Sequence, residues 1–206
     1  MHVPRATKQE RSAQTRAQIL EIALDEFSAR GFEAVSLRDI AEQAGVNHAM
    51  IRYHFGSKEA LWKESVTYLF QRLRVEVPPL DLSSEQANLD ELREYIRNYI
   101  RYCARHPEHA RLMVQESITG SERLKWVAET FIGPAHERTL NMITGAQQAI
   151  GLADFDPLTL LYMLASVTQM PYLLATELKY THDRDVLTPE AVEAHADAVI
   201  KLFFRS

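Results

Sequence analysis

The sequence predicts an all-α protein in which a small amino-terminal head precedes a larger helical body. Apolar residues recur at helical spacing along almost the whole chain, and no stretch keeps the alternation of a strand. Seven glycines and eight prolines among 206 residues are also too few for the many turns of an all-β fold. We expect the head over residues 1–77 and the body over residues 78–206, with the polar, proline-bearing segment 78–88 as the hinge.

The composition favours a soluble protein of a reducing compartment. Apolar residues make up 46% of the chain and charged residues 25%, as is usual for a globular protein. A single cysteine, Cys103, excludes an intramolecular disulfide and a multi-cysteine zinc site. No apolar segment follows the basic first sixteen residues, and polar residues and Pro171 interrupt the most apolar stretch, 158–174. We therefore expect a cytoplasmic protein with no signal peptide and no membrane contact.

The net charge of −5 resides in residues 57–206. Residues 1–56 contain seven basic and seven acidic side chains, whereas residues 57–206 contain sixteen basic and twenty-one acidic ones. Residues 1–20 carry four basic side chains against the single acid Glu10. A basic arm on a neutral head is compatible with DNA binding, although a solvated tail would show the same charges.

Capping residues and glycines divide the head into helices. An apolar stripe over residues 19–27 predicts a first helix that ends at Gly31. Ser36 opens a second helix with Asp39 three residues later, which is a capping-box arrangement, and Gly45 ends that helix.

Two more helices follow in the head. Asn47 caps the third, which stops at Gly56. Ser57 caps a longer fourth helix, which Pro78-Pro79 terminates because proline lacks an amide donor.

The body is predicted to contain five or six helices. Gly133-Pro134 is expected to break the chain, and the proline at 171 is expected to kink its helix. The expected helices lie near residues 92–103, 112–119, 121–131, 134–150, 157–180 and 189–204.

The segment from Ser36 to Lys58 has the pattern of a helix-turn-helix. Its two short helices are joined by Gly45-Val46-Asn47, and the second helix of such a unit enters the DNA major groove. Ile51 and Phe55 are expected to pack inward, which leaves the other face of that helix for DNA. The residues expected to face outward there are His48, Ala49, Arg52 and Tyr53. Arginine suits guanine edges, while tyrosine, histidine and lysine suit phosphates.

The runs 37–46 and 51–61 closely resemble the tetracycline-repressor-like (TetR) family of transcriptional regulators. The segment 27–32 also matches the usual opening of that family, so the resemblance covers about residues 12–66. It implies an all-helical homodimer with a three-helix DNA-binding head. It further implies a body that binds a small effector and dimerises through its last two helices.

The resemblance also implies roles for single residues. Ser36 falls on a phosphate-contacting hydroxyl, Arg38 on a base-contacting arginine and His48 on a variable base-reading position. Met50 and Arg52 depart from the commoner small hydroxyl residue and tyrosine, so the operator sequence does not carry over. The expected DNA-binding residues are Ser36, Arg38, Asn47, His48, Ala49, Arg52, Tyr53, His54 and Lys58.

The body is expected to enclose a mainly apolar effector pocket with a few polar groups. Its expected lining residues are Met113, Glu116, Trp126, Phe131, His136, Met142, Tyr162, Ser166, Gln169 and Met170. The same residues could instead fill a core. The pair His106 and His109 flanks a proline, which favours a helix start over a metal site, and no cofactor is expected.

Dimerisation is expected to use the last two predicted helices. The helix over 157–180 is apolar on several faces, and the last helix carries a stripe formed by Val192, Ala196, Val199, Ile200 and Phe203. Pairing both across a dyad would form a four-helix interface.

Together these patterns predict a ligand-responsive repressor released from a near-palindromic operator by a small apolar effector. The alternatives are a small helical enzyme or a protein-interaction module that uses the same body pocket. The sequence contains no G-x-S-x-G, no phosphate-binding glycine loop and no H-E-x-x-H, which disfavours an enzyme.

Overall fold

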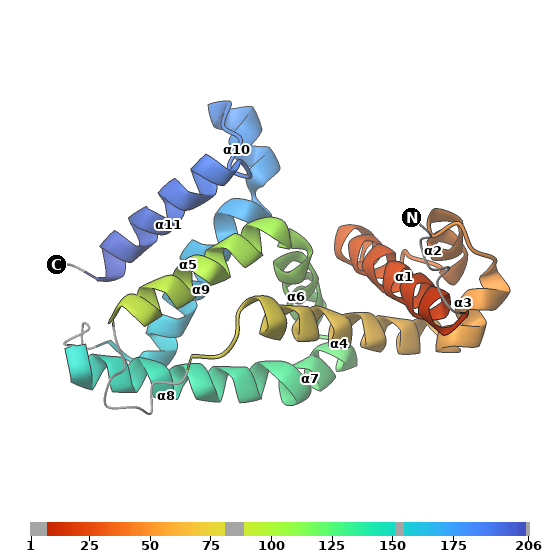
Figure 1. The fold of residues 1–206 in the computed structure, drawn as a ribbon, viewed down its shortest axis with the longest axis horizontal. Coiled ribbons are helices and arrows are strands. Elements are labelled where there is room, and N and C mark those ends of the chain that lie inside the picture. Colours follow the sequence, from red (N-terminus) through yellow and green to blue (C-terminus); the bar gives the residue numbers. More distant parts are fainter. Residues whose placement is uncertain (1–7, 81–88, 151–154, 205–206) are drawn as a thin grey trace, which may run out of the picture. The chain divides into compact units, whose positions relative to one another are not determined.

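The computed structural model describes residues 8–80, 89–150 and 155–204, and these contain helices and no strand. The expected all-α class is therefore confirmed. The chain forms two compact units, residues 1–71 and 72–206, and the fourth helix crosses from one to the other. The head helices are α1 (Lys8–Arg30), α2 (Leu37–Gln43), α3 (His48–Phe55) and α4 (Lys58–Glu76), as labelled in Figure 1.

Side-chain caps start α2 and α3 as predicted. Ser36 Oγ accepts from the Asp39 amide, and Asp39 Oδ2 accepts from the Ser36 amide, each at 3.2 Å. Asn47 Oδ1 accepts from the Met50 amide at 2.7 Å. Gly45 between the two helices has φ of +64°, a left-handed conformation that costs glycine little.

The head core is aromatic and aliphatic. Ile40, Ile51 and Trp62 are buried completely, one from each of α2, α3 and α4. Phe32 lies between two rings of this core: its centroid is 5.8 Å from that of Phe27 and 6.4 Å from that of Trp62. The short helices α2 and α3 are thus anchored by buried side chains.

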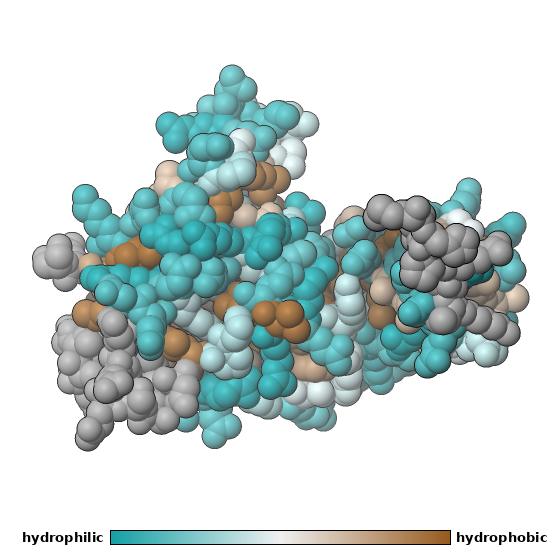
Figure 2. Space-filling model, viewed as in Figure 1, coloured by the Kyte–Doolittle hydropathy of each residue, from teal (hydrophilic) through white to brown (hydrophobic). Residues whose placement is uncertain are grey.

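The helices of the body are α5 (Leu89–Arg105), α6 (Pro107–Thr119), α7 (Glu122–Val127), η1 (Ala128–Ile132), α8 (Gly133–Ile150), α9 (Pro157–Leu173), α10 (Ala175–His182) and α11 (Pro189–Phe203), and all except η1 are labelled in Figure 1. In the body, α5 packs against α6, α9 and α11, and α8 packs against α9. The apolar face of α5 contributes Ile96, Ile100 and Cys103 to a core shared with α9 and α11. In Figure 2 most of the visible body surface is hydrophilic, with apolar residues exposed in separate patches.

Ion pairs join α11 to the polar side of α5. Arg97 donates to Glu193 at 3.0 Å and to Asp197 at 2.6 Å, and Arg101 donates two bonds to Glu193. These arginines lower the pKa of the Glu193 carboxyl. The apolar core and the ion pairs therefore hold the same two helices together.

The expected break at Gly133-Pro134 is wrong. Figure 1 shows α7, η1 and α8 as one continuous helical rod, in which residues 128–132 form a π-helical turn. The Gly133 amide donates to the Ala128 carbonyl, five residues back, and the wider turn accommodates Pro134. A Cβ at position 133 would lie 3.0 Å from that carbonyl oxygen, which explains why a glycine fits there.

The expected single helix over 157–180 is also wrong, because α9 and α10 meet at Leu174 with a bend of 64°. Pro171 has no amide to donate to the Val167 carbonyl four residues back. His195 of α11 supplies the missing donor, with Nε2 2.8 Å from that oxygen. The expected kink is thus present, and α11 stabilises it.

Two sequence expectations fall outside the described residues. These are the first seven residues of the basic arm and most of the hinge (residues 81–88). Within the described ranges no single helix is both long and apolar enough to cross a membrane. Only α9 and α10 together reach that length and composition, and they are bent against each other.

The bond between His195 and Val167 yields a double-mutant test. His195→Phe keeps a ring beside Tyr172 but removes the donor, and should destabilise the protein by about 1 kcal/mol. Pro171→Ala restores an amide that can reach the Val167 carbonyl. His195→Phe should therefore cost less in the Pro171→Ala background, as measured by denaturant unfolding. Equal costs in both backgrounds would contradict this account of the bend.

Candidate functional site

The helix α3, which is predicted to enter the DNA major groove, has one buried and one exposed face, as the sequence predicts. Ile51 is completely buried and Phe55 is 6% exposed, so both anchor the helix in the head. Tyr53 is 85% exposed although it is aromatic. The other exposed residues of α3 that were expected to meet DNA are His48, Ala49 and Arg52. A rigid helix thus presents an arginine, a histidine and a tyrosine to the outside.

The start of α2 and the α2–α3 turn add polar groups beside this face. Ser36, Arg38 and Asn47 are exposed. Ser36 Oγ and Asn47 Oδ1 act as cap acceptors, while the serine hydroxyl can still donate to a phosphate. The caps therefore fix the orientation of two candidate contact residues.

The rings of Tyr53 and His54 pack edge to face, with centroids 5.3 Å apart. His54 is half-buried and its ring also lies 6.0 Å from that of Phe55. The His54 ring therefore helps to orient the exposed side chain of Tyr53.

Lys58 has a role that sequence reasoning missed. Its ammonium donates to the carbonyls of Val35 at 2.8 Å and Glu33 at 3.4 Å, and lies 4.3 Å from the centroid of the Phe32 ring. These contacts hold the segment that leads into α2. An ammonium has three donors, so a phosphate contact stays a prediction.

Arg16 is a second functional candidate that the sequence pattern did not mark. Its guanidinium lies 5.4 Å from the centroid of the Phe55 ring and pairs with Glu64 of α4. Because the basic residue comes from α1, only the folded head shows that it supports α3.

The structure does not gather the ten expected effector residues into one place. Trp126 packs edge to face on Phe131, and His136 packs edge to face on Tyr162. Met142 packs against the core around α5, and Met113 is half-buried on α6.

The polar members of the expected pocket have separate surroundings. Glu116 is buried and accepts from Ser121 and Arg123, so it holds the start of α7. Gln169 Nε2 donates to the Tyr99 hydroxyl at 2.6 Å inside the bundle. Burial raises the pKa of that hydroxyl well above its ordinary value.

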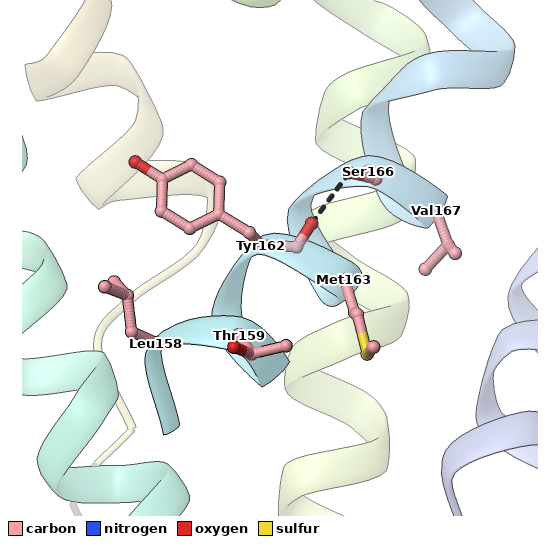
Figure 3. Close-up of a pocket in the computed structure, with 6 residues that line it drawn as sticks. All are labelled: Leu158, Thr159, Tyr162, Met163, Ser166 and Val167. Carbon is pink, nitrogen blue, oxygen red and sulfur yellow. Dashed lines mark hydrogen bonds between the residues drawn. The ribbon is translucent and has the colours of Figure 1, made fainter. Parts of the chain in front are cut away.

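Tyr162, Ser166 and Met170 lie on an exposed face of α9. In Figure 3 a shallow hollow on this face is lined by side chains from α9 alone: Leu158, Thr159, Tyr162, Met163, Ser166 and Val167. The Ser166 hydroxyl donates to the Tyr162 carbonyl of its own helix at 2.7 Å. A surface built from one helix does not enclose a ligand.

Comparisons with known proteins decide the family. The model of bacterial regulatory proteins of the tetR family matches residues 19–64, and that of the YcdC-like protein carboxy-terminal region matches residues 73–206. The chain belongs to the TetR family. It is therefore a DNA-binding transcriptional regulator, and the family resemblance seen in the sequence is confirmed.

Individual TetR relatives extend over both units. The HTH-type transcriptional regulator RutR of Escherichia coli is 34% identical over 152 residues, which are 73% of this chain and 70% of RutR. The HTH-type transcriptional repressor NicS of Pseudomonas putida is 30% identical over 150 residues, 69% of this chain and 67% of NicS.

Solved structures show the same architecture. The hemolysin II regulator HlyIIR is 27% identical with a TM-score of 0.63, and the match covers 91% of this chain and 97% of HlyIIR. A TetR family regulator from Pseudomonas syringae is 28% identical with a TM-score of 0.55, covering 92% of this chain and 94% of the other.

The two roles of Lys58 can be separated by substitution. Lys58→Met keeps the aliphatic stem but removes the charge, and should weaken binding to all duplexes alike. If the ammonium touches a phosphate, the slope of log affinity against log salt should also fall by about one. Lys63→Met, on the same helix, is the matched control for charge. A lower melting temperature with an unchanged salt slope would show that Lys58 only holds the segment before α2.

Proposed function

We propose that this TetR regulator is a homodimeric repressor that reads a near-palindromic operator with α3 and leaves it when a small effector binds. The observation that carries the DNA contact is the division of α3 between buried anchors and an exposed polar face. A two-fold dimer would place two such helices roughly 34–36 Å apart, or a multiple of it, on one side of the duplex. As a reader of DNA it would act in the cytoplasm.

Arg52 is the proposed base reader. Arg52→Ala should cost about 1–3 kcal/mol in operator binding and relax the preference at one base position. Lys63→Ala removes an equal charge from α4 and should leave the preference unchanged. The preference is measured by selecting duplexes from a random pool with each variant. An unaltered selected sequence for Arg52→Ala would remove Arg52 from the reading surface.

The dimer contact proposed here uses a different surface from the expected stripe. Val192, Ala196 and Val199 of α11 are buried in the chain's own core, so they are not available to a second copy. Large apolar side chains remain exposed along α9 and at the end of α11: Leu158, Tyr162, Met163, Met170, Leu174 and Leu202. Exposed apolar side chains concentrated on one helix favour burial against a partner. We therefore assign the dimer contact to the exposed face of α9.

Light scattering tests this assignment. At micromolar concentration the protein should have about twice the 23.6 kDa mass of one chain. Met163→Lys should shift the population toward the monomer, because it would bury a charge in the contact. Ile118→Lys changes an exposed apolar residue of α6 and should leave the dimer intact. A monomeric wild type would refute the dimer.

The effector site is proposed for the interior between α5 and α9. Tyr172 is 1% exposed, and its hydroxyl has no hydrogen-bond partner among the described residues. The hydrogen-bonded pair Tyr99 and Gln169 also joins α5 to α9. Burial, with a smaller contribution from the Cys103 thiol, raises the pKa of the Tyr99 and Tyr172 hydroxyls. A buried unpaired hydroxyl is costly, so a ligand that bonds to it would gain affinity.

The proposed effector is neutral or weakly polar, and partly aromatic or aliphatic. It should raise the melting temperature and lower operator affinity, because it would favour a dimer whose heads are spaced wrongly for DNA. Tyr172→Phe should reduce the thermal shift of such a ligand without destabilising the free protein. The measurement is a thermal-shift screen of neutral metabolites, followed by operator binding. A panel in which no compound changes either quantity would refute the effector site.

We propose that the body binds without catalysing a reaction. Burial raises the pKa of the Cys103 thiol to about 12, so almost no thiolate forms at neutral pH. A thiol that stays protonated is a poor nucleophile, which supports a regulator over the enzyme alternative.

A further inference from the structure

A carboxylate on α1 holds the far end of α2. Glu26 Oε1 accepts from Gln43 Nε2, at the last residue of α2, at 2.6 Å. Its other oxygen, Oε2, accepts from Arg30 Nη1 at 2.7 Å. The Glu26 side chain is only 13% exposed, so both oxygens are paired in a largely desolvated position where such bonds are strongest.

The same network reaches the beginning of α2. Arg30 Nη2 donates to the Ala34 carbonyl at 3.1 Å and lies 3.5 Å from Asp39 Oδ2. Asp39 Oδ2 is the acceptor of the capping box with Ser36. From Glu26, hydrogen bonds therefore reach Gln43 at one end of α2, and the Arg30 guanidinium adds an ion pair to Asp39 near the other end.

We propose that Glu26 is a positioning residue for DNA recognition, which sets the orientation of α2 on α1 and hence the placement of Ser36, Arg38 and α3. This inference rests on the proposed DNA contacts. In this proposal Glu26 acts on α2 and not by contact with DNA. Glu26 acts by fixing both ends of the seven-residue helix α2. The other residues proposed to contact DNA depend on the position of α2.

Electrostatics separates positioning from a simple charge effect. Removing a negative charge from the head strengthens binding to DNA of any sequence, because fewer charges repel the phosphates. If Glu26 positions α2, its replacement should instead weaken binding to the operator. Glu26→Gln keeps the size of the side chain but turns an NH₂ group toward one of its two donors, so one bond is lost.

The experiment compares Glu26→Gln with Glu59→Gln. Glu59 pairs with Lys63 on α4, so the control removes the same charge from another i, i+4 pair. The specific probe is the duplex that the wild type enriches from a random pool, and the non-specific probe is a scrambled duplex of the same length. Glu26→Gln should bind the specific probe about tenfold more weakly and the scrambled one no more weakly than wild type. Glu59→Gln should keep the wild-type ratio between the two.

Affinities are measured well below the melting temperature of each variant, so a loss of folding does not enter the ratio. Gln43→Ala removes only the α2 side of the network and should lower the same ratio by a smaller factor. The inference is overturned if Glu26→Gln keeps the wild-type ratio, whether both affinities stay unchanged or both change in parallel. A wild type that enriches no sequence would overturn the proposed function and this inference with it. A wild type that selects a site which Glu26→Gln binds equally well overturns the inference alone.

Discussion

The DNA-reading part of this regulator depends on the packing of two helices that are too short to persist alone. Isolated helices below about 12–15 residues are marginal in water, and α2 and α3 have seven and eight residues. Ile40 and Ile51, both fully buried, hold them in the head core. The position of every exposed side chain of α3 therefore depends on that burial.

The elements of the head were predictable because their signals are local. A capping box, an asparagine cap and glycines at the turns lie within a few residues of the groups they satisfy, and the structure confirms them at Ser36, Gly45 and Asn47. The contacts of Lys58 and Arg16 join residues 23 to 48 positions apart. No local pattern marks such pairs. The sequence therefore predicts Lys58 only as a phosphate ligand and Arg16 only as part of the basic arm.

The body shows the limit of reasoning from proline and glycine. At Gly133-Pro134 a π-helical turn absorbs a sequence that usually breaks a helix, whereas at Pro171 the bend appears and a histidine 24 residues later satisfies the freed carbonyl. Apolar periodicity likewise found the stripe on α11, but could not tell an intrachain core from a dimer contact. The hydrogen bond between Tyr99 and Gln169 was also not predictable, because the two residues lie 70 positions apart in the sequence.

The division of labour within α3 has a consequence for how this protein can change. Ile51 and Phe55 maintain the fold, whereas Arg52 and Tyr53 are exposed and contribute little to it. Surface substitutions away from caps and cores usually alter stability by less than about 0.5 kcal/mol. The proposed reading residues can therefore be exchanged one at a time, which would change the operator that the protein prefers without rebuilding its fold.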